Sequence, residues 1–532
     1  MSDSRRGLPL TKSIREKIFP KLTPVQISRI EPHGRIRSIL PGEVLIEQGD
    51  TSVPFFVVIT GEIEIVRPFG TQETLVTVHS DGQFTGEVNM LSGRRSLVRA
   101  RVTKPGKVIE LDHQQMLSLV QTDVELSGIF MRAFILRRVE LIAAGVGDIV
   151  LVGSAYSADT LRIKEFLMRN GHPYSYIDLE RDPDVQNLLD TFQVSASEIP
   201  VLICRGQIVL RTPSNQEIAD CLGFNESIDQ THVRDLIIIG AGPSGLAAAV
   251  YGASEGLDVL MLETSSPGGQ AGSSSSIENY LGFPTGISGQ ELAGRAYTQA
   301  QKFGARMLVA KASQLVCDGR PYVIELENGA RISTRTVMIA TGVQYRKLPL
   351  ENLSRFEGAG VYYGATFVEA QLCGGEEVVV VGGGNSAGQA AVFLAQNAKR
   401  VHMLVRSSGL TASMSRYLIR RIENTPTIIL RPRTEIVTLE GGAHLESVHN
   451  THWLNGCIIL DDKGFIKTGS DLLSDNLSAS AWPLMRQPYL LETSLPGVFA
   501  VGDVRSGSVK RVASAVGEGS IAISFIHKVL QE

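Results

Sequence analysis

Apolar runs that end in glycine-rich turns mark two places in this chain. In residues 235–263 the run DLIII leads into GAGPSG, an Ala-rich stretch follows, and a second apolar run, VLMLE, ends on Glu263. Residues 378–406 repeat this order, with VVVV before GGGNSA and VHMLV before Arg406. Each pattern predicts a strand, a helix and a second strand, the unit typical of dinucleotide binding.

The first turn has the glycine spacing that a pyrophosphate needs. Gly240 allows the tight turn, Gly242 lets the backbone approach the phosphates, and Gly245 lets helix and strand pack closely. The helix N-terminus offers N–H groups and the positive end of its dipole. Glu263 is placed to accept a hydrogen bond from a ribose hydroxyl. The predicted contacts of this site are Gly240, Gly242, Pro243, Ser244, Gly245 and Glu263.

The second turn has no acid at its ribose end. Val405 stands at the position equivalent to Glu263, and Arg406 and Ser407 follow it. A guanidinium binds a 2′-phosphate that a carboxylate would repel, so NADP is favoured over NAD. The alternative is that Arg406 is a solvated side chain at a strand end. The predicted contacts here are Gly382, Gly384, Asn385, Ser386, Ala387, Arg406 and Ser407.

From residue 234 onwards the chain resembles the low-molecular-weight thioredoxin reductase family. The resemblance rests on five motifs in one order: GAGPSG at 240, GGQAGSSSSIENYLGFP at 268, ATG at 340, GGGNSA at 382 and PGVFAVGDV at 496. It implies FAD at the first turn and NADPH at the second, with the second domain inserted into the first and rotating against it. It also implies further flavin contacts from Gly269, Gln270, Asn279, Gly502, Asp503, Arg511, Val512 and Ala513.

Two departures separate the chain from that family. Residues 364–367 read Gly-Ala-Thr-Phe where the family carries Cys-x-x-Cys, so no redox dithiol is expected there. The nearby Cys373 is more typical of a small buried hydrophobe than of a reactive thiol. Residues 444–464 lack a strand and a loop that the family has, so we expect a shortened nucleotide domain.

Closely spaced β-segments precede this part of the chain. Residues 35–112 contain GEVLIEQGD, FFVVITGEIEIVR, LVTVHSDGQ, SLVRARV and GKVIELD, which predict a β-roll. Residues 84–102, FTGEVNMLSGRRSLVRARV, resemble the phosphate-binding cassette of cyclic-nucleotide-binding domains of the catabolite-activator and kinase-regulatory kind. The resemblance implies a helical run over 113–144 that helps to form a homodimer, and nucleotide contacts from Gly86, Glu87, Arg95 and Ser96. Alternatively, the arginines form a solvated charged face: Arg94, Arg95 and Arg99.

Residues 148–226 predict a strand, a loop, a helix and a strand, and resemble a thioredoxin or glutaredoxin fold. Pro200 follows Ile199 where that fold keeps a cis-proline. The loop that would carry the cysteines reads Ser-Ala-Tyr-Ser-Ala-Asp at 154–159. We therefore expect a docking or scaffolding domain instead of a redox module.

Composition narrows the remaining possibilities. The net charge is −4, and no basic cluster is interleaved with aromatic residues, so we do not expect a nucleic-acid partner. No apolar run has membrane length, and residues 1–17 lack the apolar stretch of a signal peptide. The five cysteines are widely spaced and odd in number, which favours a reducing cytoplasm and disfavours both a disulfide framework and a zinc site.

These patterns predict a multidomain chain with both α/β and β domains. We expect a cyclic nucleotide-binding-like β-roll at 20–145, a thioredoxin/glutaredoxin-like domain without cysteines in its active-site loop at 148–226, a Rossmann-like FAD-binding domain at 232–345 and 467–532, and a Rossmann-like NAD(P)-binding domain inserted at 346–466. The expected function is that of a cytoplasmic FAD-dependent oxidoreductase. It takes a hydride from NADPH and reduces an unidentified acceptor, such as a small redox protein, without a dithiol.

Two other functions remain open for this chain. One is a ferredoxin–NADP reductase-like enzyme, and the other is a non-enzymatic flavin- or nucleotide-binding signalling protein. A cyclic nucleotide is a candidate effector of the expected oxidoreductase. We assign no catalytic side chain and no metal ligand.

Overall fold

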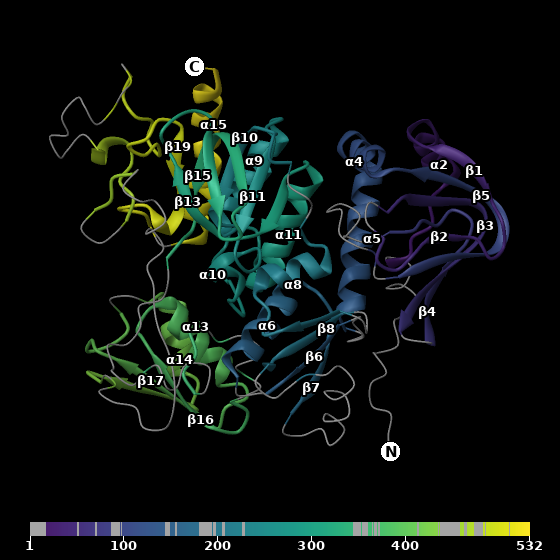
Figure 1. The fold of residues 1–532 in the computed structure, drawn as a ribbon. Helices are drawn as coiled ribbons and strands as arrows, with labels where there is room; N and C mark the ends of the chain where they lie inside the picture. Colours follow the sequence, from purple (N-terminus) through teal and green to yellow (C-terminus); the bar gives the residue numbers. More distant parts are fainter. Residues whose placement is uncertain are drawn as a thin grey trace.

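The structure is a computed structural model of the whole chain (Figure 1). It describes residues 18–50, 53–69, 72–86, 96, 98–143, 149–154, 157–179, 194, 198–204, 208–225, 229–343, 353, 360–363, 365, 370, 373–411, 414–434, 436, 458–461, 465–472, 482, 484, 486–509 and 511–531. The chain forms four units: a β-roll unit, a thioredoxin-like unit, and two nucleotide domains. The second nucleotide domain interrupts the first one in the sequence. In Figure 1 the β-roll unit lies to one side, and its helices face the other three.

The β-roll unit is built on two long strands that stay paired. The strands are β1 (Arg35–Ile39), β2 (Val44–Ile46), β3 (Phe55–Phe69), β4 (Gln72–His79) and β5 (Arg99–Leu111), in the order β1-β5-β3-β4 with β2 on β5. The sequence predicted two strands where β5 is continuous. Gly61, at φ +102°, and Gly106 let β3 and β5 stay in contact through several register shifts, because a Cβ at Gly106 would overlap the backbone of Thr60.

Alternate side chains of β3 fill two different cores. Phe56 and Val58 face the interior of the roll, while Phe55 and Val57 face the helices. Phe84 and Phe130 complete the second core, with their ring centroids 4.8 Å apart. The helices of this unit are α2 (Pro24–Ile30), α4 (His113–Thr122) and α5 (Val124–Ala143). The predicted helical run over 113–144 is therefore confirmed as two helices.

The thioredoxin-like unit has the predicted order of strand, helix and strand. Its elements are β6 (Ile149–Gly153), α6 (Ala158–Arg169), β7 (Ser175–Asp178), β8 (Val201–Cys204), β9 (Ile208–Arg211) and α8 (Asn215–Leu222). The sheet order is β7-β6-β8-β9, with β6 and β7 parallel and the other pairs antiparallel. Ser157 caps α6, Ser214 caps α8, and the peptide bond before Pro200 is cis as predicted.

The first nucleotide domain has a seven-stranded sheet. Its elements are β10 (Arg234–Ile239), α9 (Pro243–Ser254), β11 (Val259–Glu263), α10 (Gly269–Gly272), α11 (Gly289–Lys302), β12 (Arg306–Val309), β13 (Ala312–Val316), β14 (Tyr322–Leu326), β15 (Arg331–Ile339), β19 (Val498–Ala500) and α15 (Val512–Gln531). The order is β12-β11-β10-β15-β14-β13, with β19 parallel to β15. The chain therefore leaves this sheet after β15 and returns to it at β19.

The second nucleotide domain lies below the first in Figure 1. Its elements are β16 (Glu377–Val381), α13 (Asn385–Leu394), β17 (Arg400–Val405), α14 (Arg416–Glu423) and β18 (Ile428–Pro432). The three strands are parallel, in the order β16-β17-β18. Most of the segment predicted to be shortened, residues 444–464, lies outside the described residues, so that expectation remains a prediction.

One apolar core joins the thioredoxin-like unit to the first nucleotide domain. Ile163 and Phe166 of α6 belong to the same contiguous buried cluster as Leu236 of β10 and Ile523 of α15. All four side chains are fully buried. The two units therefore bury apolar surface against each other and are expected to unfold together.

We expect Phe166→Ala to destabilise both units by about 3–5 kcal/mol, because it leaves a cavity in their common core. The tryptophans, Trp453 and Trp482, lie outside the thioredoxin-like unit, so their fluorescence reports unfolding beyond it. Denaturant titration of the variant should move the tryptophan transition to lower concentration. Phe130→Ala, in the β-roll core, is the control and should leave that transition in place. An unchanged transition in Phe166→Ala would contradict a common core.

Candidate functional site

The turn after β10 lies close to other main-chain segments. Gly240 adopts φ +103°, and a Cβ there would crowd the backbone of Ala340 and Thr341. Gly242 is the N-cap of α9, and no atom lies within 4 Å of the position a Cβ would take. The turn therefore leaves open space in front of the helix N-terminus, where a pyrophosphate would bind.

Glu263 joins the end of β11 to this turn. Its carboxylate accepts hydrogen bonds from the backbone N–H of Ala241 at 2.8 Å and of Ser265 at 3.0 Å. Each carboxylate oxygen has further acceptor capacity. The predicted ribose contact is thus compatible with the position of Glu263.

The C-terminal Gly-Asp motif meets the same turn. Gly502, at φ +72°, and Gly519 of α15 both lie so close to Ser244 that a Cβ on either would overlap it. The N–H of Gly502 donates to Glu518 at 2.8 Å, and Glu518 forms an ion pair with Arg505 at 2.6 Å. The start of α9 is therefore held against Gly502 and the middle of α15. Of the residues that hold it, Arg505, Glu518 and Gly519 were not among the predicted contacts.

The segment predicted to line the flavin, residues 268–284, covers the turn. Together with residues 264–267, which lead into it, we call it the flavin segment. Gly268 donates its N–H to the carbonyl of Ala241 at 2.7 Å, and a Cβ on Gly269 would lie 3.1 Å from Cα of Gly242. The amide of Gln270 donates to the carbonyl of Val343. These contacts bring residues 240–245, 263, 269–270 and 502–503 to one place. The arrangement fits FAD, because its glycines leave room for the phosphates where side chains would close it.

The other residues predicted to contact the flavin lie outside this cluster of residues. Arg511 and Ala513 are exposed at the start of α15, with half-buried Val512 between them. Asn279 is exposed, and the preceding Glu278 forms an ion pair with Arg421 of α14 at 2.7 Å. This hydrogen-bonded pair raises the pKa of Arg421. It joins the second nucleotide domain to the segment that the family resemblance assigns to the flavin.

The second turn has the same backbone geometry with a different third residue. Gly382 adopts φ +133°, and a Cβ there would lie 3.2 Å from Cβ of Ala387. Gly384 is the N-cap of α13 and has open space in front of it. Asn385 accepts from the N–H of Ser415 at 2.7 Å, which ties α13 to the start of α14.

The ribose end of the second turn is open to solvent. Ser386 is exposed at the start of α13, and Arg406 and Ser407 are exposed just after β17. The hydroxyl of Ser407 donates to the carbonyl of Gly409 at 2.6 Å. The guanidinium of Arg406 therefore stands where a 2′-phosphate can reach it.

The cysteines differ from expectation in one respect. Of residues 364–367 only Ala365 is described, and it packs against the core of the second nucleotide domain. Cys204, which is buried, and Cys373, which is half-buried, form no disulfide bond. Cys317 is disulfide-bonded, and its partner lies outside the described residues. The sequence disfavoured a disulfide framework and did not single out Cys317, because spacing along the sequence does not show which residues the fold brings together.

In the β-roll unit the cassette is described at residues 84–86, 96 and 98–102. Gly86 adopts φ +101°, and its carbonyl accepts from Nη1 of Arg137 on α5 at 2.7 Å. Glu87 and Arg95 lie outside the described residues. The hydroxyl of Ser96 donates to the carbonyl of Val98 at 2.8 Å, so it must rotate to donate to a phosphate.

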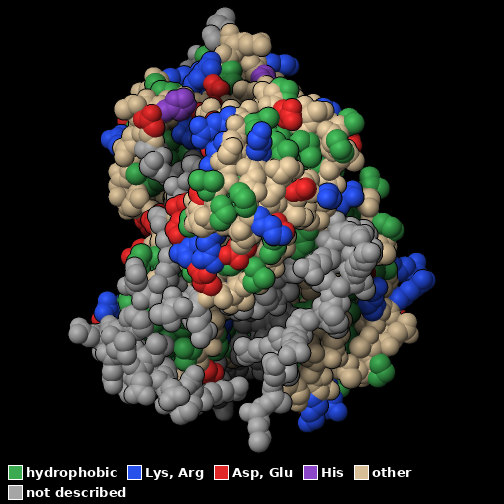
Figure 2. All heavy atoms as spheres, turned by 90° about the vertical axis from the view of Figure 1, so that its right-hand side faces the viewer, with side chains coloured by type: hydrophobic (Ala, Val, Ile, Leu, Met, Phe, Trp, Pro, Cys, Tyr) green, Lys and Arg blue, Asp and Glu red, His purple; other side chains and the backbone are tan. Residues whose placement is uncertain are grey.

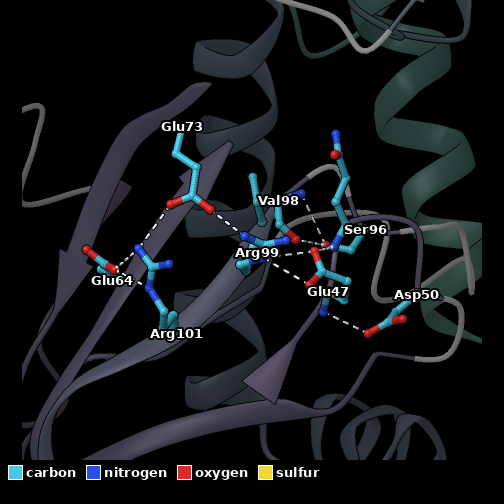
Figure 3. Close-up of polar contacts among 9 residues, drawn as sticks. Glu47, Asp50, Glu64, Glu73, Ser96, Val98, Arg99 and Arg101 are labelled. Carbon is cyan, nitrogen blue, oxygen red and sulfur yellow. Dashed lines mark hydrogen bonds and ion pairs between the residues drawn. The ribbon is translucent and has the colours of Figure 1, made fainter. Parts of the chain in front are cut away.

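Arginines near the cassette are engaged by carboxylates (Figure 3). Arg99 pairs with Glu47 at 2.9 Å and also with Glu73, and Arg101 pairs with Glu64 at 2.6 Å. Hydrogen bonds to Glu47 and Glu64 raise the pKa values of Arg99 and Arg101, respectively. Figure 2 shows basic and acidic side chains interspersed on this side of the molecule. Arg99 is thus part of a charged strand face and is not directed at a phosphate.

Comparison with known proteins identifies two families. A model of the pyridine nucleotide-disulphide oxidoreductases matches residues 234–519, and a model of the cyclic nucleotide-binding domain matches residues 36–123. The thioredoxin reductase of Bacillus subtilis (strain 168) is 32% identical over 315 residues, covering 57% of this chain and 97% of that protein. The thioredoxin reductase of Mycoplasma pneumoniae is 30% identical and covers 56% and 96%. The crystal structure of Lactococcus lactis thioredoxin reductase in its FR conformation is 25% identical, covers 56% and 100%, and has a TM-score of 0.48.

Two nucleotide-binding turns, one of them enclosed by a glycine cradle, define a flavoprotein that exchanges electrons with a nicotinamide nucleotide. The chain belongs to the pyridine nucleotide-disulphide oxidoreductase family and carries an N-terminal cyclic nucleotide-binding domain. It is an FAD-dependent oxidoreductase of the thioredoxin reductase type, and its cofactors are FAD and NADPH. In the part of the chain that the structure describes, no helix could cross a membrane and no group of His, Cys, Asp or Glu could hold a metal ion.

Glu263→Gln is expected to weaken FAD binding about tenfold or more. The change places an amide NH2 beside two backbone donors and removes charge-assisted hydrogen bonds worth about 1.5–3 kcal/mol. FAD titration of the apoprotein measures the effect. Glu255→Gln, which loses only a surface pair with His527, is the control. Equal FAD affinity in the two variants would rule out this role for Glu263.

Arg406→Ala is expected to remove most of the preference for NADPH over NADH, because one phosphate contact is worth about tenfold to a hundredfold in affinity. The ratio of kcat/KM for the two coenzymes measures it. Arg400→Ala, at the other end of β17, where Arg400 pairs with Glu377, is the control and should keep the preference. A preference that survives Arg406→Ala would point to another residue.

Proposed function

We propose that this enzyme carries electrons from NADPH through FAD to an acceptor without a dithiol in its second nucleotide domain. The observation behind this proposal is the sequence Gly-Ala-Thr-Phe at 364–367, in a chain that otherwise keeps both nucleotide-binding turns. When bound, FAD accepts a hydride from NADPH and passes two electrons onward. An acceptor that the flavin reduces directly, such as a small redox protein, fits this arrangement best.

The roles of the chain's own residues follow from their positions. Residues 240–245 at the start of α9 bind the phosphates of FAD, Gly502 and Asp503 hold its ribityl and phosphate end, and Glu263 binds a ribose. Arg406 binds the 2′-phosphate of NADPH. We assign residues 232–345 and 467–532 to FAD binding and residues 346–466 to NADPH binding. The Arg421–Glu278 ion pair then orients the NADPH-binding domain against the flavin segment.

We further propose that a cyclic nucleotide regulates this reaction through helices in contact. Arg137 of α5 holds the carbonyl of Gly86, in the cassette. Helix α4 packs against α11, and the amide of Gln121 donates to the carbonyl of Lys302 at 2.9 Å. At the other end of α11, Gly289 lies directly against α10 in the flavin segment. A ligand that shifts the β-roll helices can therefore act on the flavin segment, provided that its affinity differs between the two states.

If no dithiol takes part, the cysteine thiols are not needed for reduction of the flavin by NADPH. Anaerobic mixing with NADPH should bleach the flavin, and alkylation of every accessible thiol should leave the bleaching rate nearly unchanged. A standard thioredoxin should be reduced negligibly. A flavin that NADPH fails to bleach would exclude the proposed enzyme. Efficient thioredoxin reduction that is lost in Cys373→Ser would show that a thiol takes part.

If a cyclic nucleotide regulates the reaction, one variant should lose nucleotide binding and another should lose only the effect on the rate of NADPH oxidation. Calorimetric titration with cyclic AMP and cyclic GMP should show binding, and Arg95→Ala should abolish it because the phosphate loses its cation. Gln121→Ala should still bind the nucleotide but respond less in NADPH oxidation rate, because a hydrogen bond between α4 and α11 is lost. The absence of heat at millimolar ligand would refute binding. Unchanged rates in the liganded wild-type protein would refute regulation.

A further inference from the structure

The C-terminal end of α6 contacts the main chain of the flavin segment. Arg169 donates through Nη2 to the carbonyl of Gly269 at 2.6 Å. Asn170 donates to the carbonyl of Ser265 at 3.0 Å, and Gln290 donates back to the carbonyl of Met168 at 2.8 Å. Three side-chain hydrogen bonds thus span a stretch of only three residues in the thioredoxin-like unit.

A second contact comes from the start of α8. Asn215 donates to the carbonyl of Thr264 at 3.1 Å, directly after Glu263. The thioredoxin-like unit therefore donates hydrogen bonds to the carbonyl groups of residues 264, 265 and 269. The first two precede residues 268–272, which cover Gly242, and the third lies among them. Hydrogen bonds to backbone carbonyls hold a main-chain segment in position, and they do not depend on the side chains of that segment.

Arg169 is the charged member of this set. Its side chain is only 14% exposed, and Nη1 pairs with Glu165 at 3.0 Å on the same helix. The planar guanidinium can therefore hold Glu165 and Gly269 at once, with the two contacts on different nitrogens. A Cβ on Gly272 would lie 3.1 Å from Nη2, so the guanidinium also fills the space beside α10.

We propose that Arg169 is a positioning residue for FAD, and that the thioredoxin-like unit, whose loop at 154–159 carries no cysteine, acts as a fixed brace for the flavin segment. Arg169 acts through the carbonyl of Gly269, which sets the path of residues 268–272 over the turn at Gly242. The proposal rests on the proposed assignment of Gly269 and Gln270 to the flavin. It gives a unit without redox cysteines a direct part in flavin binding.

A purely structural role for α6 makes a different prediction. If Arg169 only stabilised the thioredoxin-like unit, any comparable arginine on the same helix would have the same effect on the flavin. Arg162 is such a residue, since it pairs with Asp159 at 2.8 Å and donates to Asn215 and to the carbonyl of Pro213. These partners lie within the thioredoxin-like unit, and only Asn215 links Arg162 indirectly to the flavin segment, so Arg162→Met is the matched control.

The experiment compares Arg169→Met, Arg169→Lys and Arg162→Met in the full-length chain. FAD is removed, the apoproteins are titrated with FAD, and the visible circular dichroism of the bound flavin is recorded. We expect Arg169→Met to weaken FAD binding about tenfold and to change the flavin dichroism at saturation. Arg169→Lys keeps the charge and one donor, so it should recover part of the affinity. Arg162→Met removes only an indirect contact through Asn215, so it should lose much less affinity than Arg169→Met and keep the flavin dichroism of the wild type.

Two results would overturn the proposal. One is wild-type affinity and dichroism in Arg169→Met, and the other is an equal loss in Arg169→Met and Arg162→Met. If Arg169→Met does not fold, Arg169→Lys decides: reduced affinity with altered dichroism supports the brace, and wild-type values overturn it. These measurements need FAD alone, so they remain decisive even if NADPH fails to bleach the wild-type flavin.

Discussion

Close approach of main chain to main chain is the constraint on which the rest of this molecule depends. The turn at residues 240–245 lies against the backbone of Ala340, of Gly269 and of Gly519 in α15. A Cβ at Gly240 or Gly519 would overlap its neighbours, and one at Gly269 would lie 3.1 Å from Cα of Gly242, so separate parts of the sequence supply glycine where they meet. With glycine at these positions, open space remains in front of the N-terminus of α9, where the backbone can bind a pyrophosphate.

Contacts outside this centre tie the other units to it. The thioredoxin-like unit contributes a common apolar core and hydrogen bonds to the carbonyls of the flavin segment. The β-roll unit contributes α4, which packs on the far end of α11. The second nucleotide domain contributes Arg421. Among the described residues, the thioredoxin-like unit and the second nucleotide domain therefore contact the flavin segment directly, and the β-roll unit reaches it through α11.

Local sequence patterns predicted those parts of the fold that depend on interactions between residues close together in the sequence. Both strand–turn–helix units, the helices after the β-roll and the strand–helix–strand order of the thioredoxin-like unit follow from periodicity and glycine placement. Contacts between distant residues were not visible in this way. The continuity of β5 depends on Gly61 in another strand, the partner of Gly502 is a carboxylate sixteen residues further along, and Arg169 contacts a carbonyl that has no sequence signature. The disulfide at Cys317 belongs to the same class.

The common core of α6 and the first nucleotide domain limits how the chain can be divided. A unit attached only by a linker could be removed without exposing the interior of its neighbour. Here removal of the thioredoxin-like unit would leave buried side chains such as Leu236 and Ile523 in a cluster without its other half, and an exposed apolar surface of that kind promotes aggregation. The first nucleotide domain therefore depends on the thioredoxin-like unit to cover part of its own interior.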